Sequence, residues 1–190
     1  FLVSITMMFS LMPVISILIE LYQGLSFPGW LSWLEEYFKE GEERAQQWTN
    51  SLLSVARIDD LVIVILIVAI IPGIAEEFFF RGLVQHQLQD ILRNKHHAIL
   101  LAAFLFSFFH FQVYGFIPRM LLGILFGYLF MWSNNILYPI AAHVTNNLIG
   151  VLGSYFWGTD IMNYKEGGLF PLVLLFPSII ITAAFKKKKK

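Results

Sequence analysis

Long apolar runs, rather than alternating polar and apolar positions, dominate this chain. A helix needs roughly 20 apolar residues to cross the ~30 Å hydrocarbon core of a bilayer, and five or six runs qualify. A membrane barrel would instead show alternation. The pattern therefore predicts an all-α fold, a polytopic transmembrane helix bundle of about six spans, at 1–22, 61–90, 98–111, 119–132, 136–156 and 169–185.

A more polar segment, 24–57, lies between the first two spans. Its acidic residues are interleaved with apolar side chains at roughly helical spacing, namely Trp30, Trp33, Leu34, Tyr37 and Phe38. This pattern favours an interfacial amphipathic helix on the membrane surface, and a solvated helical loop is the alternative. Neither interpretation assigns chemistry to the segment.

The composition indicates that most of this chain is surrounded by lipid rather than by water. Hydrophobic residues make up 57% of the chain and charged residues 14%, whereas soluble domains carry about 25% charged residues. Five of the charges form the basic tail 186–190. An ordinary soluble enzyme and a nucleic-acid partner are thereby excluded, and membrane lipid is the expected surrounding. Without cysteine, a thiolate nucleophile and a Cys-based metal site are excluded too.

We interpret residues 1–190 as a single transmembrane domain whose site-bearing core is 58–156. The sequence starts at Phe1 rather than at a methionine. We therefore expect it to be a fragment from which amino-terminal helices can be missing.

Polar side chains inside the predicted spans are concentrated in three of them. Burying a charged residue at mid-bilayer costs about 2.5 kcal/mol or more, so such residues indicate function. The second span carries Glu76, Glu77 and Arg81, the third carries His110, and the fifth carries His143, Asn146 and Asn147. At 1.5 Å per residue, Glu76, His110 and Asn147 each lie roughly 18–20 Å from the inner end of their span. We expect them to meet at one level and form a site.

Spacings of four residues strengthen this expectation, because residues four apart share a helix face. Such spacings join Glu77 to Arg81, Phe106 to His110, and His143 to Asn147. A carboxylate beside an imidazole can deprotonate water for general-base hydrolysis. His143 and Asn147 can donate hydrogen bonds to the oxyanion that follows, each worth about 2.7–4 kcal/mol. A divalent metal held by His and Glu is equally compatible with the spacing.

These residues form three ordered motifs, EExxxR at 76–81, FxxxH at 106–110 and HxxxN at 143–147. Over 58–156 the chain resembles the CAAX protease and bacteriocin-processing (CPBP/Abi) family of intramembrane endopeptidases, which includes the type II CAAX prenyl endopeptidase. The resemblance implies that Glu76 is the catalytic base, that His110 helps it activate water, and that His143 and Asn147 form the oxyanion hole. Glu77, Arg81 and Phe106 would support the site.

The resemblance also implies a peptide or protein substrate and a multi-pass integral membrane protein, which we expect in a bacterial cell membrane. We expect no obligatory cofactor. A divalent metal such as zinc, held by Glu76, His110 and His143, is the alternative mechanism. A non-catalytic protein, such as a peptide-binding immunity scaffold or a transporter subunit, is the alternative function, because buried polar residues also line binding or proton paths.

Overall fold

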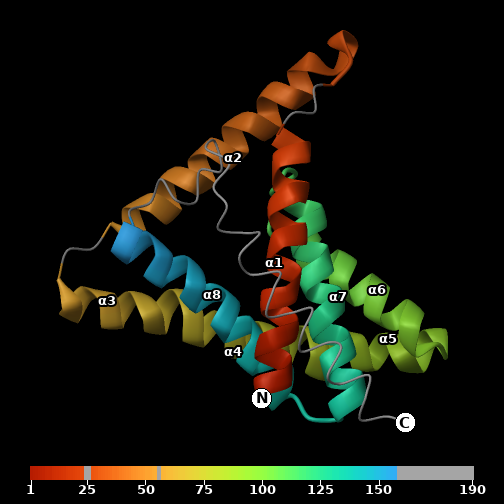
Figure 1. Ribbon diagram of the computed structural model, residues 1–190. Helices are drawn as coiled ribbons and strands as arrows, with labels where there is room; N and C mark the ends of the chain where they lie inside the picture. Colours follow the sequence, from red (N-terminus) through yellow and green to blue (C-terminus); the bar gives the residue numbers. More distant parts are fainter. Residues whose placement is uncertain (24–26, 55–56, 158–190) are drawn as a thin grey trace.

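The computed structural model describes residues 1–23, 27–54 and 57–157, and this part of the chain is helical throughout (Figure 1). The helices are α1 (Leu2–Gln23), α2 (Ser32–Leu53), α6 (Lys95–Phe108), α7 (Phe116–Ser133) and α8 (Leu137–Trp157), together with one long helix over 58–92. A short 3-10 turn, η1 (Gly29–Leu31), precedes α2. The all-α prediction is confirmed for the described residues.

The long helix consists of five consecutive segments, two of which have the wider turn of a π-helix. They are α3 (Ile58–Val64), the π-helical η2 (Ile65–Ile70), α4 (Ile71–Glu77), the π-helical η3 (Phe78–Val84) and α5 (Gln85–Leu92). The first π-helical segment precedes Pro72. A proline lacks the backbone N–H and clashes with the preceding turn of an α-helix, and widening that turn accommodates it without ending the helix.

Two helices of the described part, 58–92 and 116–133, are long and apolar enough to cross a membrane. The apolar helices at 2–15 and 95–108 are shorter. The helical runs expected at 1–22, 61–90, 119–132 and 136–156 are present within three residues of their predicted bounds. The span count of about six is not established. The predicted span 169–185 and the basic tail lie outside the described residues.

The third run differs from the prediction at its carboxyl end. Helix α6 ends at Phe108, and His110 therefore lies in the loop before α7 rather than on the helix. The short turn between α5 and α6 is fixed by two residues. Arg93 adopts a left-handed conformation that ends α5, and the side chain of Asn94 accepts hydrogen bonds from the next helix's first amides.

Close packing of α7 and α8 against their neighbours holds the bundle together. Helix α7 packs on α6, α8 and α1, and α8 packs on α4 and η2. One apolar cluster lies between α1, α7 and α8, made of Met8, Leu122, Leu125, Phe126, Leu129 and Ala142. A second joins the end of α2 to the long helix and α8, made of Leu53, Leu61, Val64, Ala69 and Val151.

Helix α2 runs obliquely from the top of α1 to the end of α8 (Figure 1). Its predicted helical nature is confirmed over 32–53. The aromatic side chains Trp33, Tyr37 and Trp48, together with Trp30 just before the helix, are exposed. Exposed aromatic side chains of this kind are typical of a helix at a membrane interface.

Candidate active site

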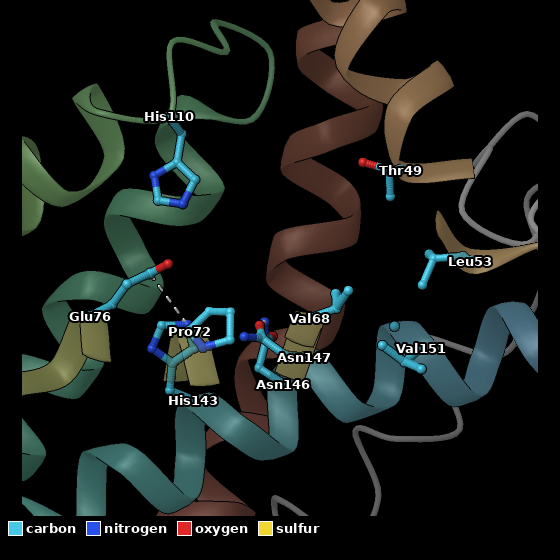
Figure 2. Close-up of a pocket in the computed structure, with 11 residues that line it drawn as sticks. Thr49, Leu53, Val68, Pro72, Glu76, His110, His143, Asn146, Asn147 and Val151 are labelled. Atoms are coloured by element: carbon cyan, nitrogen blue, oxygen red, sulfur yellow. Dashed lines mark hydrogen bonds and ion pairs between the residues drawn. The ribbon is translucent and has the colours of Figure 1, made fainter. Parts of the chain in front are cut away.

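The predicted site residues gather around one cavity of about 310 Å³ between four parts of the fold (Figure 2). Glu76 comes from α4, His110 from the loop after α6, and His143 and Asn147 from α8. Helix α2 closes another side. The remaining lining residues are Thr49, Leu53, Val68, Pro72, Asn146, Gly150 and Val151. Three separate segments that carry the motifs therefore meet, as their spacing and depth predicted.

A close approach of α4 to α8 brings Glu76 to His143. At Gly73, a Cβ atom would lie 2.7 Å from Val144 Cγ2 and 3.2 Å from the Val144 backbone nitrogen. Glycine is therefore needed at this contact, which lies about one turn from Glu76 and involves the residue that directly follows His143. Glu76 Oε2 consequently lies 3.8 Å from His143 Nε2. The Glu76 side chain keeps 31% of its surface exposed, so water can reach the carboxylate.

Glu77 faces away from the cavity and joins three helices. Its Oε1 atom lies 2.7 Å from His143 Nδ1 and accepts a 3.0 Å bond from Arg81 Nη1. Arg81 in turn donates to the Gly123 carbonyl of α7 at 2.9 Å. Glu77 and Arg81 are both fully buried. These bonds connect α4, α7 and α8, whereas Glu77 Oε2 and Arg81 Nε are buried without a hydrogen-bond partner among the described residues.

The bond from Glu77 determines how His143 presents its second nitrogen. A carboxylate only accepts hydrogen bonds, so His143 Nδ1 carries the proton and Nε2 faces Glu76 and the cavity. The imidazole also stacks on Phe126, with ring centroids 4.9 Å apart, and meets the edge of Phe106. The ring of His143 is thus contacted by Phe126 on one side and by Phe106 on the other.

His110 lies beyond the end of α6, and its ring is held by Phe106, the first residue of the FxxxH motif. Its Nδ1 donates to the Phe106 carbonyl at 2.8 Å, and its ring packs on the Phe106 ring. Figure 2 shows the His110 ring and the Glu76 carboxylate pointing toward one another. No direct hydrogen bond between them is present among the described residues. With Nδ1 protonated, a neutral His110 keeps Nε2 free to accept a hydrogen bond.

Asn147 lies one turn beyond His143 on the same face of α8. Its Oδ1 accepts a hydrogen bond of 3.2 Å from Asn146 Nδ2. In this assignment of the amide atoms, the Nδ2 group of Asn147 is left available as a donor on a cavity-lining residue.

The buried polar row on the long helix extends beyond the motif. Glu77, Arg81 and Gln85 follow at four-residue spacing, and Gln85 donates to the Gly127 carbonyl of α7. The π-helical segment turns less per residue than an α-helix, which keeps all three side chains on one face. Gly123 and Gly127 allow α7 to pack closely against α6, because a Cβ at either position would lie 3.0 Å or less from an atom of α6.

Two features of the site region could not be read from the sequence motifs. Helix α2 contributes Thr49 and Leu53 to the cavity. Arg119 lies next to the loop that carries His110, and its charge interacts electrostatically with Glu76 and His110. Arg119 was expected at the start of a span, and the sequence indicated only that it is a cation at a helix end.

The alternative mechanism needs a metal ion held by Glu76, His110 and His143. Among the described residues, no three His, Asp or Glu side chains are grouped closely enough to hold a metal ion. Glu76, His110 and His143 therefore do not fit as a metal site in their present arrangement.

The apolar helices thus surround a polar cavity that is lined by residues of all three motifs. Residues 58–149 match the family model described as type II CAAX prenyl endopeptidase Rce1-like. This match is consistent with the resemblance to the CAAX protease family that was read from the motifs. No curated protein and no solved structure gave a match.

The family match and the apolar helices fit the description of a membrane protein, a hydrolase and a protease. The match points to a CAAX-type intramembrane endopeptidase, and such a protease acts on a membrane-associated peptide or protein. The division of roles among the cavity residues goes beyond the family assignment and is proposed below.

Proposed function

We propose that this protein hydrolyses a peptide bond of a membrane-associated peptide or protein with a water molecule activated by Glu76 and His110. One observation carries the proposal. Glu76, His110, His143 and Asn147 line the same cavity, and the first two point toward one another without a direct hydrogen bond (Figure 2). A water between them can donate one hydrogen bond to the Glu76 carboxylate and another to His110 Nε2.

In the first step, the water loses a proton to Glu76 as its oxygen attacks the carbonyl carbon of the peptide. The carbonyl oxygen becomes an oxyanion, and Asn147 Nδ2 can donate a hydrogen bond to it. In the second step, Glu76 returns the proton to the nitrogen as the C–N bond breaks. The products are a carboxylic acid and an amine, so Glu76 ends in its starting state.

His143 can serve as the second oxyanion donor only in one protonation state. Its Nδ1 proton is used by Glu77, so Nε2 can donate only when the ring carries a second proton. The Glu77 carboxylate, itself held by Arg81, is then the counter-charge of the imidazolium. In this proposal Glu77 and Arg81 position and charge His143, which is a more specific role than the support that the motif alone implied.

Replacing Glu76 with glutamine tests the proposal, because the amide keeps the size of the side chain but cannot accept the proton. Purified wild-type protein and Glu76→Gln are incubated with membrane-associated peptides, and fragments are identified by mass spectrometry. Wild type and the exposed control Glu36→Gln should yield fragments, and Glu76→Gln should yield none. Fragments at the wild-type rate from Glu76→Gln would remove this residue from the mechanism.

The same assay separates the alternatives. Cleavage that survives a chelator supports the glutamate mechanism, and cleavage that is lost and restored by zinc supports the metal-dependent version. Binding of peptides without any fragment would instead support a non-catalytic, peptide-binding protein.

A further inference from the structure

Asn146 and Asn147 are adjacent in α8, and both side chains line the cavity (Figure 2). Consecutive residues of an α-helix point about 100° apart, so their side chains do not face each other by default. These two nevertheless meet, because Asn146 Nδ2 donates a hydrogen bond of 3.2 Å to Asn147 Oδ1. The two amides are therefore joined side by side at the cavity wall.

A pair of adjacent asparagines is an unfavourable choice for an apolar helix. Asparagine forms helices less readily than alanine, and polar side chains inside a membrane span mark helix contacts or functional sites. Thr145, the residue before the pair, bonds its hydroxyl to the Ala141 carbonyl of the same helix at 2.7 Å. Asn146 instead bonds a side chain of the cavity, which ties its polar group to the site rather than to the backbone of α8.

The two ends of the Asn147 amide act in opposite ways on a negative charge. Nδ2 is a donor and stabilises an oxyanion, whereas Oδ1 is an acceptor and repels it. A half-turn about the last bond of the side chain exchanges the two ends with little change in shape. The hydrolysis proposed above therefore needs an interaction that keeps Nδ2 toward the cavity.

Asn146 supplies the one hydrogen bond that the Asn147 side chain makes within the described part of the chain. Because Asn146 Nδ2 can only donate, it selects the Oδ1 end of the Asn147 amide. Among the described residues, Asn147 Nδ2 makes no hydrogen bond of its own and is not sealed from the cavity. The bond thus leaves the donor end free for a ligand.

We propose that Asn146 is a positioning residue, which holds the Asn147 amide with Nδ2 toward the oxyanion. The inference rests on the proposed function, which supplies the oxyanion. Asn146 acts on the reaction through Asn147 and not through the substrate. The HxxxN motif at 143–147 leaves position 146 open, so the motif itself assigns no role to Asn146.

A double-mutant cycle tests this dependence. Values of kcat and KM are measured on a cleavable peptide for Asn146→Ala, for Asn147→Ala and for the variant that carries both. In the wild-type background, Asn146→Ala should lower kcat by about 2- to 10-fold, the range of one neutral hydrogen bond, and leave KM unchanged. In the Asn147→Ala background, the same substitution should change kcat by a factor of about one.

Asn146→Leu separates positioning from folding, because leucine has nearly the size of asparagine but no donor. Leucine also forms helices more readily and suits an apolar span. We therefore expect a thermal midpoint equal to or above that of wild type, together with the same loss of kcat as in Asn146→Ala. A merely structural role of Asn146 would make kcat follow the midpoint.

Thr145→Val is the matched control on the same helix. It keeps the branched shape and removes a hydroxyl that bonds only the α8 backbone, so kcat should equal that of wild type.

A loss of kcat from Asn146→Ala that is equally large in the Asn147→Ala background would overturn the proposal, because Asn146 would then act on the substrate or the fold directly. A raised KM with unchanged kcat would overturn it too, as would wild-type kinetics in both Asn146 variants. If wild-type protein cleaves no peptide, the proposed function has failed and this inference falls with it. That outcome is read from wild type alone, so the two failures are distinguished.

Discussion

His143 Nδ1 and Glu77 Oε1 lie 2.7 Å apart although 66 residues separate them in the chain. This bond directs the other imidazole nitrogen toward Glu76 and the cavity. It also ties α4 to α8 at the level where the motif residues meet. The second glutamate of the EExxxR motif is therefore linked to the site through His143, while the first glutamate faces the cavity itself.

Replacing Glu77 with glutamine should lower kcat by about 10- to 100-fold, the usual loss when a residue that orients an active group is removed. The amide can still accept a bond from His143, but it no longer balances a positive imidazole ring. The measurement is kcat on a cleavable peptide, with Glu36→Gln as the control. A kcat equal to that of wild type would show that His143 needs no counter-charge.

Asn147→Ala should lower kcat by about 10²- to 10³-fold with little change in KM, because the lost hydrogen bond forms only in the transition state. Asn146→Ala is the matched comparison, since Asn146 also lines the cavity but bonds the oxygen of Asn147. We expect a smaller loss from it. If Asn146→Ala were the more damaging of the two, the oxyanion role would pass to Asn146.

Gly73→Ala should separate α4 from α8, because the added Cβ meets both the side chain and the backbone of Val144. Overpacking of this kind costs about 1–3 kcal/mol and should lower both the thermal midpoint and kcat. Gly41→Ala in α2 is the control, since nothing lies within 4 Å of its Cβ position. Alanine there should leave kcat unchanged and stabilise the helix by about 0.5–1 kcal/mol. Equal effects from the two variants would contradict the close-packing argument.

Burial raises the pKa of the Glu42 carboxyl, and the charge of Arg119 acts in the opposite direction. A carboxyl whose pKa is higher in the folded state contributes stability below its ordinary value of 4.5, and that stability is lost as the pH rises through the raised pKa. The thermal midpoint of Glu42→Gln should therefore fall less than that of wild type as the pH rises from about 4.5 through the raised pKa of Glu42.

The exposed neighbour Glu43 gives the matched control for this pH comparison, and Glu43→Gln should follow the wild-type curve. Parallel curves for Glu42→Gln and wild type would show that burial of the Glu42 carboxyl has no influence on stability. Thermal unfolding in detergent, followed by circular dichroism, provides the midpoints.

The sequence predicted the parts of this molecule that depend on periodicity within one helix. Four-residue spacing placed His143 and Asn147 on one face of α8, and the depth argument brought them to the level of Glu76. Periodicity cannot predict contacts between helices at atomic detail. The bond from Glu77 to His143 and the approach of Arg119 to the His110 loop both depend on such packing, so they became visible only in the structure.

His110 shows that a contact can be predicted correctly from the sequence even when the expected secondary structure is wrong. The spacing to Phe106 correctly indicated that the two residues contact, but it assumed a continuous helix. The helix ends at Phe108, and a hydrogen bond from the His110 ring to the Phe106 carbonyl maintains the contact instead. The π-helical segments were likewise not predicted, because a proline such as Pro72 can also end or kink a helix and no comparable residue marks the second segment.

The wide turn over Phe78–Val84 makes the number of residues in this helix as important as their identity. Each residue of a helix adds a fixed rotation, about 100° in an α-helix and less in a π-helix, so deleting a single residue here would rotate the following residues relative to the preceding ones. Gln85 would then leave the carbonyl of Gly127, and α5 would meet α6 with a different face. Natural variants of this segment should therefore differ by substitution, and insertions or deletions should be confined to the loops.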